Sequence, residues 1–75
     1  MAHDVIPMYL MGNDLKHRIR SLAGSQHRFA TVLGISPAHL SRALAGKRDI
    51  QDVWVAVIEL LEALPQKDWP ERWKR

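Results

Sequence analysis

Two short helical patterns separated by only three residues, 34–36, constrain the fold of this chain more than any other feature. Apolar residues recur at helical spacing over residues 29–33 and again over residues 40–44. Two helices joined so tightly must cross steeply, as in a helix-turn-helix. Such a crossing needs a small residue at the closest approach, a glycine where the first helix ends and an apolar side chain in the corner. These needs are met by Ala30, Gly34 and Ile35, with Leu40 beneath the second helix.

The remaining segments are also helical in pattern, and no segment alternates with period two. The expected starts are Asn13, Ser25, Ser36 followed by Pro37, and Asp52; the expected stops are Gly24, Gly34, Gly46 and Pro65. We therefore predict an all-α fold, a compact domain of four to five helices over residues 12–64. An extended or loosely packed arm (residues 1–11) precedes this domain, and a short tail (residues 65–75) follows it.

Length and composition narrow the possible classes of protein. The 75 residues suffice for one domain, and the absence of cysteine excludes disulfides and thiolate metal sites. The four histidines show no pair at helical ligand spacing, so no metal is expected. We find no glycine-rich phosphate loop and no Ser/His/Asp arrangement, and predict neither an enzyme nor a cofactor. The longest apolar run (residues 53–58) is too short to span a membrane and no signal peptide is evident, which predicts a cytoplasmic protein.

The positive charge is unevenly distributed. Residues 1–50 carry seven Lys or Arg against three Asp or Glu, whereas residues 51–75 carry four against five. The excess of cations thus coincides with the two closely spaced helices, where a polyanion could be met. An ordinary solvated surface would explain the same distribution.

The segment that contains the two closely spaced helices resembles the lambda-repressor-like family of Cro and CI regulators, and more loosely the short regulators encoded beside anti-CRISPR genes. The resemblance covers residues 15–64. Its most specific parts are Ser25-Gln26, Phe29-Ala30, Leu33-Gly34-Ile35-Ser36, Leu40-Ser41-Arg42 and Gly46-Lys47. It implies a bundle of four or five helices whose third helix, residues 36–42, enters the major groove of DNA.

The resemblance also implies roles for single residues. Those expected to meet base edges are Pro37, Ala38, His39, Ser41 and Arg42, and those expected to contact phosphates are Gln26, Arg28, Ser36, Lys47 and Arg48. Arg42 can donate two parallel hydrogen bonds to guanine, and the methyl group of Ala38 can contact thymine. Pro37 and Ala38 stand where the family often has long polar side chains, so DNA shape is expected to carry part of the specificity.

Each of these residues also has a simpler interpretation. Arg42 could pair with Asp49, and the hydroxyl of Ser41 could bond back to a helix carbonyl. His39 could be a solvated histidine. The pair Lys47-Arg48 could be a basic C-cap that suits the helix dipole.

The last predicted helix is more apolar than one core face requires, with an apolar arc of roughly 220°. We predict that one half of the arc faces the core and the other half faces a second subunit. The expected core residues are Val53, Val57, Leu60 and Leu64; the expected dimer interface is Trp54, Ile58 and Leu61. Coverage of that flank by the arm or by the tail, with Trp69 and Trp73, is the alternative.

Together these features predict a sequence-specific regulator of double-stranded DNA, a dimeric repressor that binds an inverted repeat. Such small regulators often belong to phages or mobile elements and repress their own operon. With one domain, no small-molecule effector is expected. The alternative is a protein-interaction module, such as an antitoxin, which would not need a basic surface on these two helices.

Overall fold

A computed structural model describes the chain from Met8 to Lys74, and its side chains from Gly12. The described residues form four α-helices and two short 3₁₀ turns, without a strand: α1 (Met8–Ala23), α2 (Gln26–Leu33), α3 (Pro37–Leu44), α4 (Asp52–Ala63), η1 (Gln66–Asp68) and η2 (Glu71–Trp73). The predicted all-α class is confirmed. None of the described helices is both long enough and apolar enough to cross a membrane.

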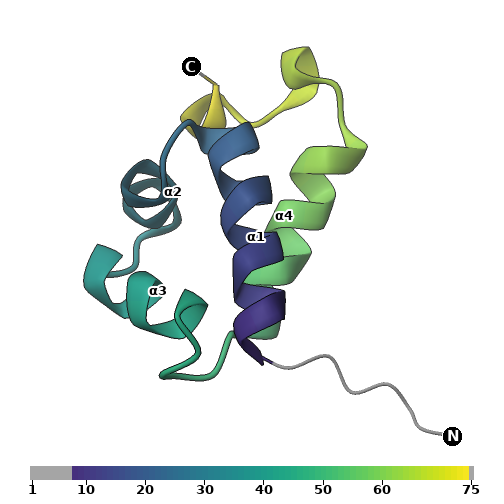
Figure 1. Ribbon diagram of the computed structural model, residues 1–75. Coiled ribbons are helices and arrows are strands. Elements are labelled where there is room, and N and C mark those ends of the chain that lie inside the picture. Colours follow the sequence, from purple (N-terminus) through teal and green to yellow (C-terminus); the bar gives the residue numbers. More distant parts are fainter. Residues whose placement is uncertain (1–7, 75) are drawn as a thin grey trace, which may run out of the picture.

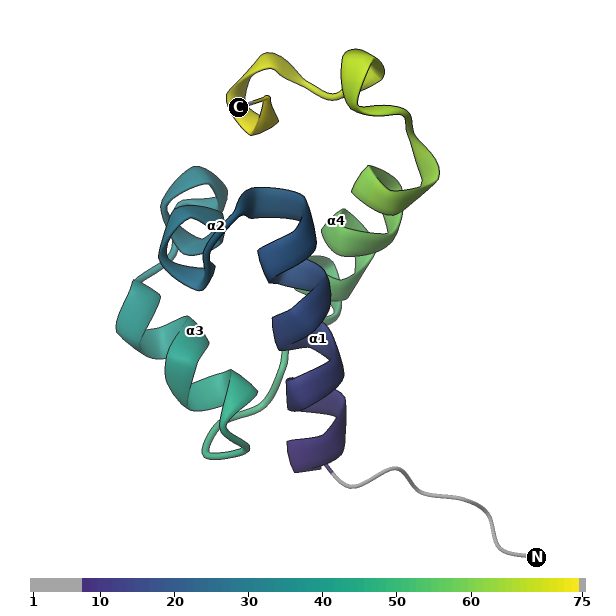
Figure 2. The same ribbon diagram turned by 45° about the horizontal axis from the view of Figure 1, so that its top comes forward.

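Helix α1 occupies the middle of the compact fold (Figures 1 and 2). Helices α2 and α3 pack on one side of it and α4 packs on the other. The largest fully buried side chains come from all four helices: Leu15, Ile19, Phe29, Leu40, Leu44 and Ile58. A single apolar core therefore fixes α2 and α3 relative to the rest of the chain.

Helix α1 begins earlier than the sequence predicted. It starts at Met8, so residues 8–11 of the expected arm belong to the helix, and the rest of that arm lies outside the described residues. Asn13 and Asp14, predicted as cap and first turn, are exposed positions within the helix. Polar residues on a solvated face have the same composition as a helix start, which explains the error.

Helix α4 faces the core with the half of its surface that was predicted to face a partner. Trp54, Ile58 and Leu61 are buried, at 2%, 0% and 3% exposure. Of the residues predicted as core, Val53, Leu60 and Leu64 are exposed and Val57 is half-buried. The predicted dimer interface is therefore wrong.

An ion pair between α1 and α4 accompanies this orientation of α4. The guanidinium of Arg18 donates to both carboxylate oxygens of Glu62, at 2.7 and 2.9 Å, and to Asp14 at 3.2 Å. The hydrogen bonds from Arg18 lower the pKa of the Glu62 carboxyl. The adjoining stripe of Ile58 and Leu61 lies in the core.

The start of α4 differs slightly from its prediction. Gln51 occupies the cap position without a side-chain cap bond, and Asp52 lies in the first turn, where its charge suits the helix dipole. The helix ends at Ala63, ahead of Pro65 as predicted.

The tail folds back over the end of the helices, from α4 toward α2 (Figure 2), as the alternative interpretation required. Trp69 and Trp73 are each 6% exposed. The indole N–H of Trp69 donates to the carbonyls of Leu61 and Leu64, at 2.9 and 3.0 Å. The ring of Trp73 packs against Phe29 with 5.3 Å between ring centroids. The tail thus completes the core and connects α4 to α2.

We expect Trp73→Ala to lower the free energy of unfolding by about 3–5 kcal/mol, because a large aromatic side chain leaves a cavity beside Phe29. A domain of this size is stable by only about 5 kcal/mol, so the variant should be largely unfolded by circular dichroism. Arg72→Ala, an exposed neighbour, is the control and should unfold like the wild type. A Trp73 variant as stable as the control would contradict this role of the tail.

Gly12 allows α1 to approach the end of α3. A Cβ at this position would overlap the backbone carbonyl of Leu44, which cannot move away as a side chain could. Helix propensity alone favours Gly12→Ala by about 1 kcal/mol. We expect the steric overlap to outweigh the gain in helix propensity, so that the free energy of unfolding measured in urea falls by about 1–3 kcal/mol. A higher urea midpoint than the wild type would show that the two helices do not need this close approach.

Candidate nucleic-acid interface

The turn between α2 and α3 has the hydrogen bonding that a tight helix end requires. Gly34 adopts a left-handed conformation, with φ of 87°, as its predicted role demands. Its amide donates to the carbonyls of Ala30 and Thr31, and the amide of Ile35 donates back to Ala30 at 3.0 Å. The side chain of Ile35 packs against the core between the helices. These contacts set the direction in which the chain leaves α2.

Capping serines begin α2 and α3 as predicted. The hydroxyl of Ser25 accepts a hydrogen bond from the amide of Arg28 at 3.0 Å, and Ser36 accepts one from His39 at 3.3 Å. Pro37 follows Ser36 in the first turn of α3. The predicted phosphate ligand Gln26 is half-buried at the first position of α2, where backbone amides lack acceptors within the helix.

Helix α3 buries one face and exposes the opposite one. Leu40, Ala43 and Leu44 are fully buried in the core. Four exposed residues form the opposite stripe: Ala38, Ser41, Arg42 and Ala45. Pro37, which was also predicted to meet bases, is half-buried at the edge of this stripe. We call the four exposed residues the α3 face; three of them have short side chains, so a ligand can come close to the helix backbone.

Ala45 belongs to the α3 face but was not among the residues predicted to meet base edges. It ends α3 as the cap residue, with its side chain exposed. The sequence does contain a signal for it, since Ala45 is seven residues after Ala38 and thus lies on the same side of a helix.

The end of α3 brings several cations together. The amide of Lys47 donates to the carbonyl of Arg42 at 2.9 Å, and that of Gly46 donates to Ala43 at 3.0 Å. Gly46 adopts a left-handed conformation in this turn, with φ of 85°. The chain therefore reverses at Gly46 and holds Lys47 and Arg48, both exposed, beside the last turn of α3.

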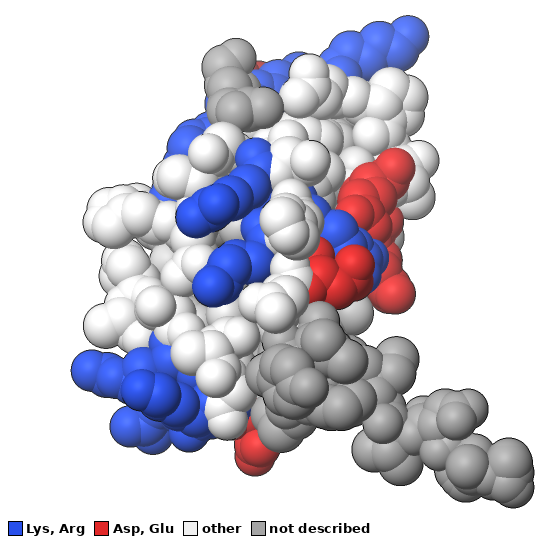
Figure 3. All heavy atoms as spheres, viewed as in Figure 1, with Lys and Arg blue, Asp and Glu red and all other residues white. Residues whose placement is uncertain are grey.

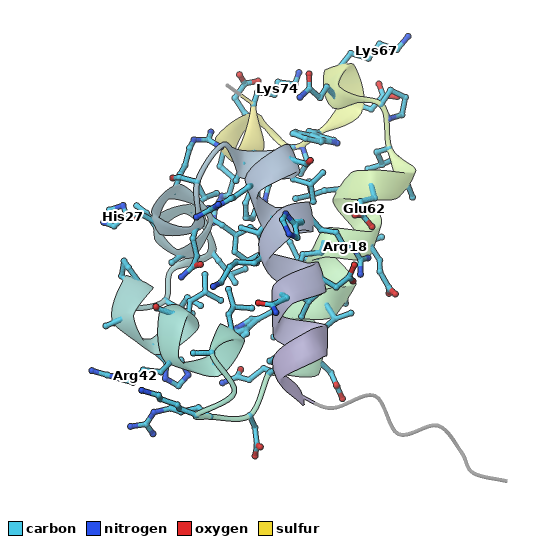
Figure 4. All side chains as sticks on the ribbon, viewed as in Figure 1. Arg18, His27, Arg42, Glu62, Lys67 and Lys74 are labelled. Carbon is cyan, nitrogen blue, oxygen red and sulfur yellow. The ribbon has the colours of Figure 1, made fainter. Side chains whose placement is uncertain are left out.

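Arg42 keeps its charge free for a ligand. Among the residues that the structure describes, the ion pairs are those of Arg18, so the alternative pairing of Arg42 with Asp49 does not form. Nor does the Ser41 hydroxyl bond to a carbonyl within this part of the chain. One group of Lys and Arg lies where α3 ends, and others lie over the middle of the viewed face and at the end that carries Lys67 and Lys74, whereas acidic side chains gather on the side of Glu62 (Figures 3 and 4).

His39 and Arg28 have packing roles that the sequence did not indicate. The half-buried ring of His39 meets Trp54 edge to face, with 5.6 Å between centroids, and so connects α3 to α4. The guanidinium of Arg28 donates to the carbonyl of Lys74 at 3.0 Å and to that of Ala23 at 3.4 Å. Because these contacts hold the tail, we do not retain Arg28 among the phosphate ligands.

Other candidate sites lie away from α3. Two surface hollows of nearly equal size, about 290 and 280 Å³, are lined by the tail and by α4. In the part of the chain that the structure describes, no three His, Asp or Glu side chains come together as a metal ion would require. The α3 face with its adjoining cations combines exposed positive charge with a rigidly packed helix.

Comparison with protein-family models, with curated proteins and with solved structures gave no significant match to this chain.

Proposed function

We propose that α2, the turn and α3 form a helix-turn-helix in a sequence-specific regulator of double-stranded DNA, a repressor that acts as a dimer. One observation carries the proposal. A rigidly held helix exposes a stripe of mostly short side chains that includes Arg42, which has no ion-pair partner among the described residues, next to Lys47 and Arg48. The resemblance of the sequence to Cro and CI regulators favours repression of the protein's own operon, in a phage or mobile element.

The dimensions of α3 suit the major groove of DNA. The groove is about 12 Å wide, and a helix with its side chains is about 10–12 Å across. Short side chains at Ala38, Ser41 and Ala45 let the helix backbone approach the base edges. In that position Arg42 can donate two hydrogen bonds to a guanine, and Ala38 can contact a thymine methyl group.

Contacts with phosphates would fix the position of α3 in the groove. The candidates are Gln26 at the start of α2, Ser36 at the start of α3, and Lys47 and Arg48 after its end. These residues lie at the ends of the two helices, where amides and flexible cations reach the DNA backbone. They would raise affinity for any sequence, and the α3 face would select among sequences.

One α3 face offers few base contacts, so we infer that two subunits act together on an inverted repeat. Two recognition helices that follow the same face of DNA have centres about 34 Å apart, one helical turn. Linking two weak sites raises affinity through effective concentration.

A protein-interaction module, such as an antitoxin, is the second candidate, and the exposed apolar side chains of α4 favour it. Leu60 is 62% exposed and Val53 is 56% exposed. Substitutions on the α3 face distinguish the two functions, because only DNA binding requires that face.

Selection from random duplexes followed by binding titrations tests the proposal. We expect an inverted repeat to be enriched. Arg42→Ala should reduce the binding free energy by about 1–3 kcal/mol per half-site and relax the sequence preference at one base pair. Lys47→Ala should weaken binding to all DNA sequences alike. It should also reduce the slope of the logarithm of the binding constant against the logarithm of salt concentration by about one unit per subunit.

Arg72→Ala is the matched control, since it removes the same charge from the exposed tail. It should leave both the selected sequence and the salt dependence unchanged. If no sequence is enriched, or if the three variants affect binding equally, the protein does not read DNA with α3.

A further inference from the structure

Six apolar side chains form a continuous face along α4 and its C-cap residue Leu64. Most of this face is exposed, and Val57 at its edge also packs against the core. We call it the outer face: Val53, Ala56, Val57, Leu60, Ala63 and Leu64. At 100° per residue these positions span about 120° of the helix, and no charged residue lies between them. Val53, Leu60 and Leu64 are 56%, 62% and 41% exposed. Beside them a largely apolar groove of about 280 Å³ continues to Pro70 and Trp73 of the tail.

We propose that the outer face binds the outer face of a second copy of this chain, with the two α4 helices antiparallel. The four larger residues, at positions 53, 57, 60 and 64, are separated by four, three and four residues, the spacing of an interhelical seam. In an antiparallel pair with its two-fold axis level with residues 58 and 59, Val53 meets Leu64 of the second copy. In the same register Val57 meets Leu60, so the face is complementary to itself.

The flanking residues favour the same arrangement. Ala56 and Ala63 lie along one side of the seam, where small side chains let two helices approach closely. Asp52 is exposed at the start of α4, and Lys67 is exposed just beyond its end. Antiparallel helices bring the start of one α4 near the end of the other, so that opposite charges and opposite ends of the helix dipoles meet. A parallel pair would instead bring the two Asp52 carboxylates together.

The size of this face predicts a weak dimer. The 12 residues of α4 extend about 18 Å. A contact of this length buries less than the roughly 800 Å² per partner that is typical of stable complexes. The inference deepens the proposed function, because a weak two-fold pair would be strengthened when both subunits bind one inverted repeat.

Disulfide formation tests the register without DNA. The chain has no cysteine, so single cysteines can be introduced at two exposed positions as Val53→Cys and Leu64→Cys. When the two variants are mixed and mildly oxidised, we expect mainly the disulfide that joins one copy of each variant. In the proposed register two copies of the same position lie about 16 Å apart along the helices, so either variant alone should cross-link poorly. Preferential cross-linking of Leu64→Cys to itself, or no cross-linking above a reduced control, would overturn the proposal.

Sedimentation of Leu60→Glu over a range of concentrations tests the interface in a second way. The substituted position is exposed, so the variant should remain helical and melt like the wild type. It should be monomeric where the wild type dimerises, whereas Ser21→Glu, which adds the same charge to an exposed position of α1, should dimerise normally. A wild type that stays monomeric throughout, or a Leu60→Glu variant that dimerises normally, would exclude this interface.

Binding to DNA then distinguishes the two proposals. We expect Leu60→Glu to bind a single half-site like the wild type and to lose about 100-fold in affinity for the inverted repeat. If dimerisation and the mixed disulfide are found but no DNA sequence is bound, the interface stands and the proposed function fails. If half-sites are bound and the mixed disulfide is absent, the proposed function stands and this interface fails.

Discussion

The hydrogen bond from the amide of Ile35 to the carbonyl of Ala30 is the contact on which the candidate site depends. It requires the left-handed conformation of Gly34 and directs α3 across the end of α2. Once that direction is set, Leu40, Ala43 and Leu44 enter the core, and the opposite side of α3 faces solvent. The exposed stripe that contains Arg42 is therefore a consequence of how α2 ends, and its orientation is as rigid as the turn.

The core beneath this stripe needs every element of the small chain. Helix α4 contributes Trp54, which contacts His39 of α3, and the tail contributes Trp73, which packs on Phe29 of α2. Both helices of the candidate site are thus supported from the opposite side of the molecule. A change in the tail would weaken the proposed DNA binding through stability alone, so binding experiments on variants need a parallel measurement of folding.

The turn between α2 and α3 and the starts of these two helices were predictable from neighbouring residues, whereas the starts of α1 and α4 were not. Ser25, Ser36 and Gly34 act through hydrogen bonds within a few residues, and all three have the predicted roles. The rotation of α4 was not predictable in this way, because its apolar arc is wide enough for either half to be buried. The packing that buries one half depends on residues distant in sequence, and the accompanying ion pair, between Arg18 and Glu62, joins residues 44 positions apart. The packing of Arg28 against the carbonyl of Lys74 was missed for the same reason.

Backbone amide shifts in a titration with DNA test the central claim most directly. A duplex that carries one selected half-site is the ligand, and a scrambled duplex at the same salt concentration is the reference. If α3 reads DNA, the shifts specific to the selected half-site should be largest at Ala38, Ser41 and Arg42, with smaller ones at Gln26 and Lys47. The outer face of α4 should be unaffected, since a single half-site engages one subunit. Specific shifts that are largest on α4 or on the tail would contradict the claim that α3 is the DNA-reading helix.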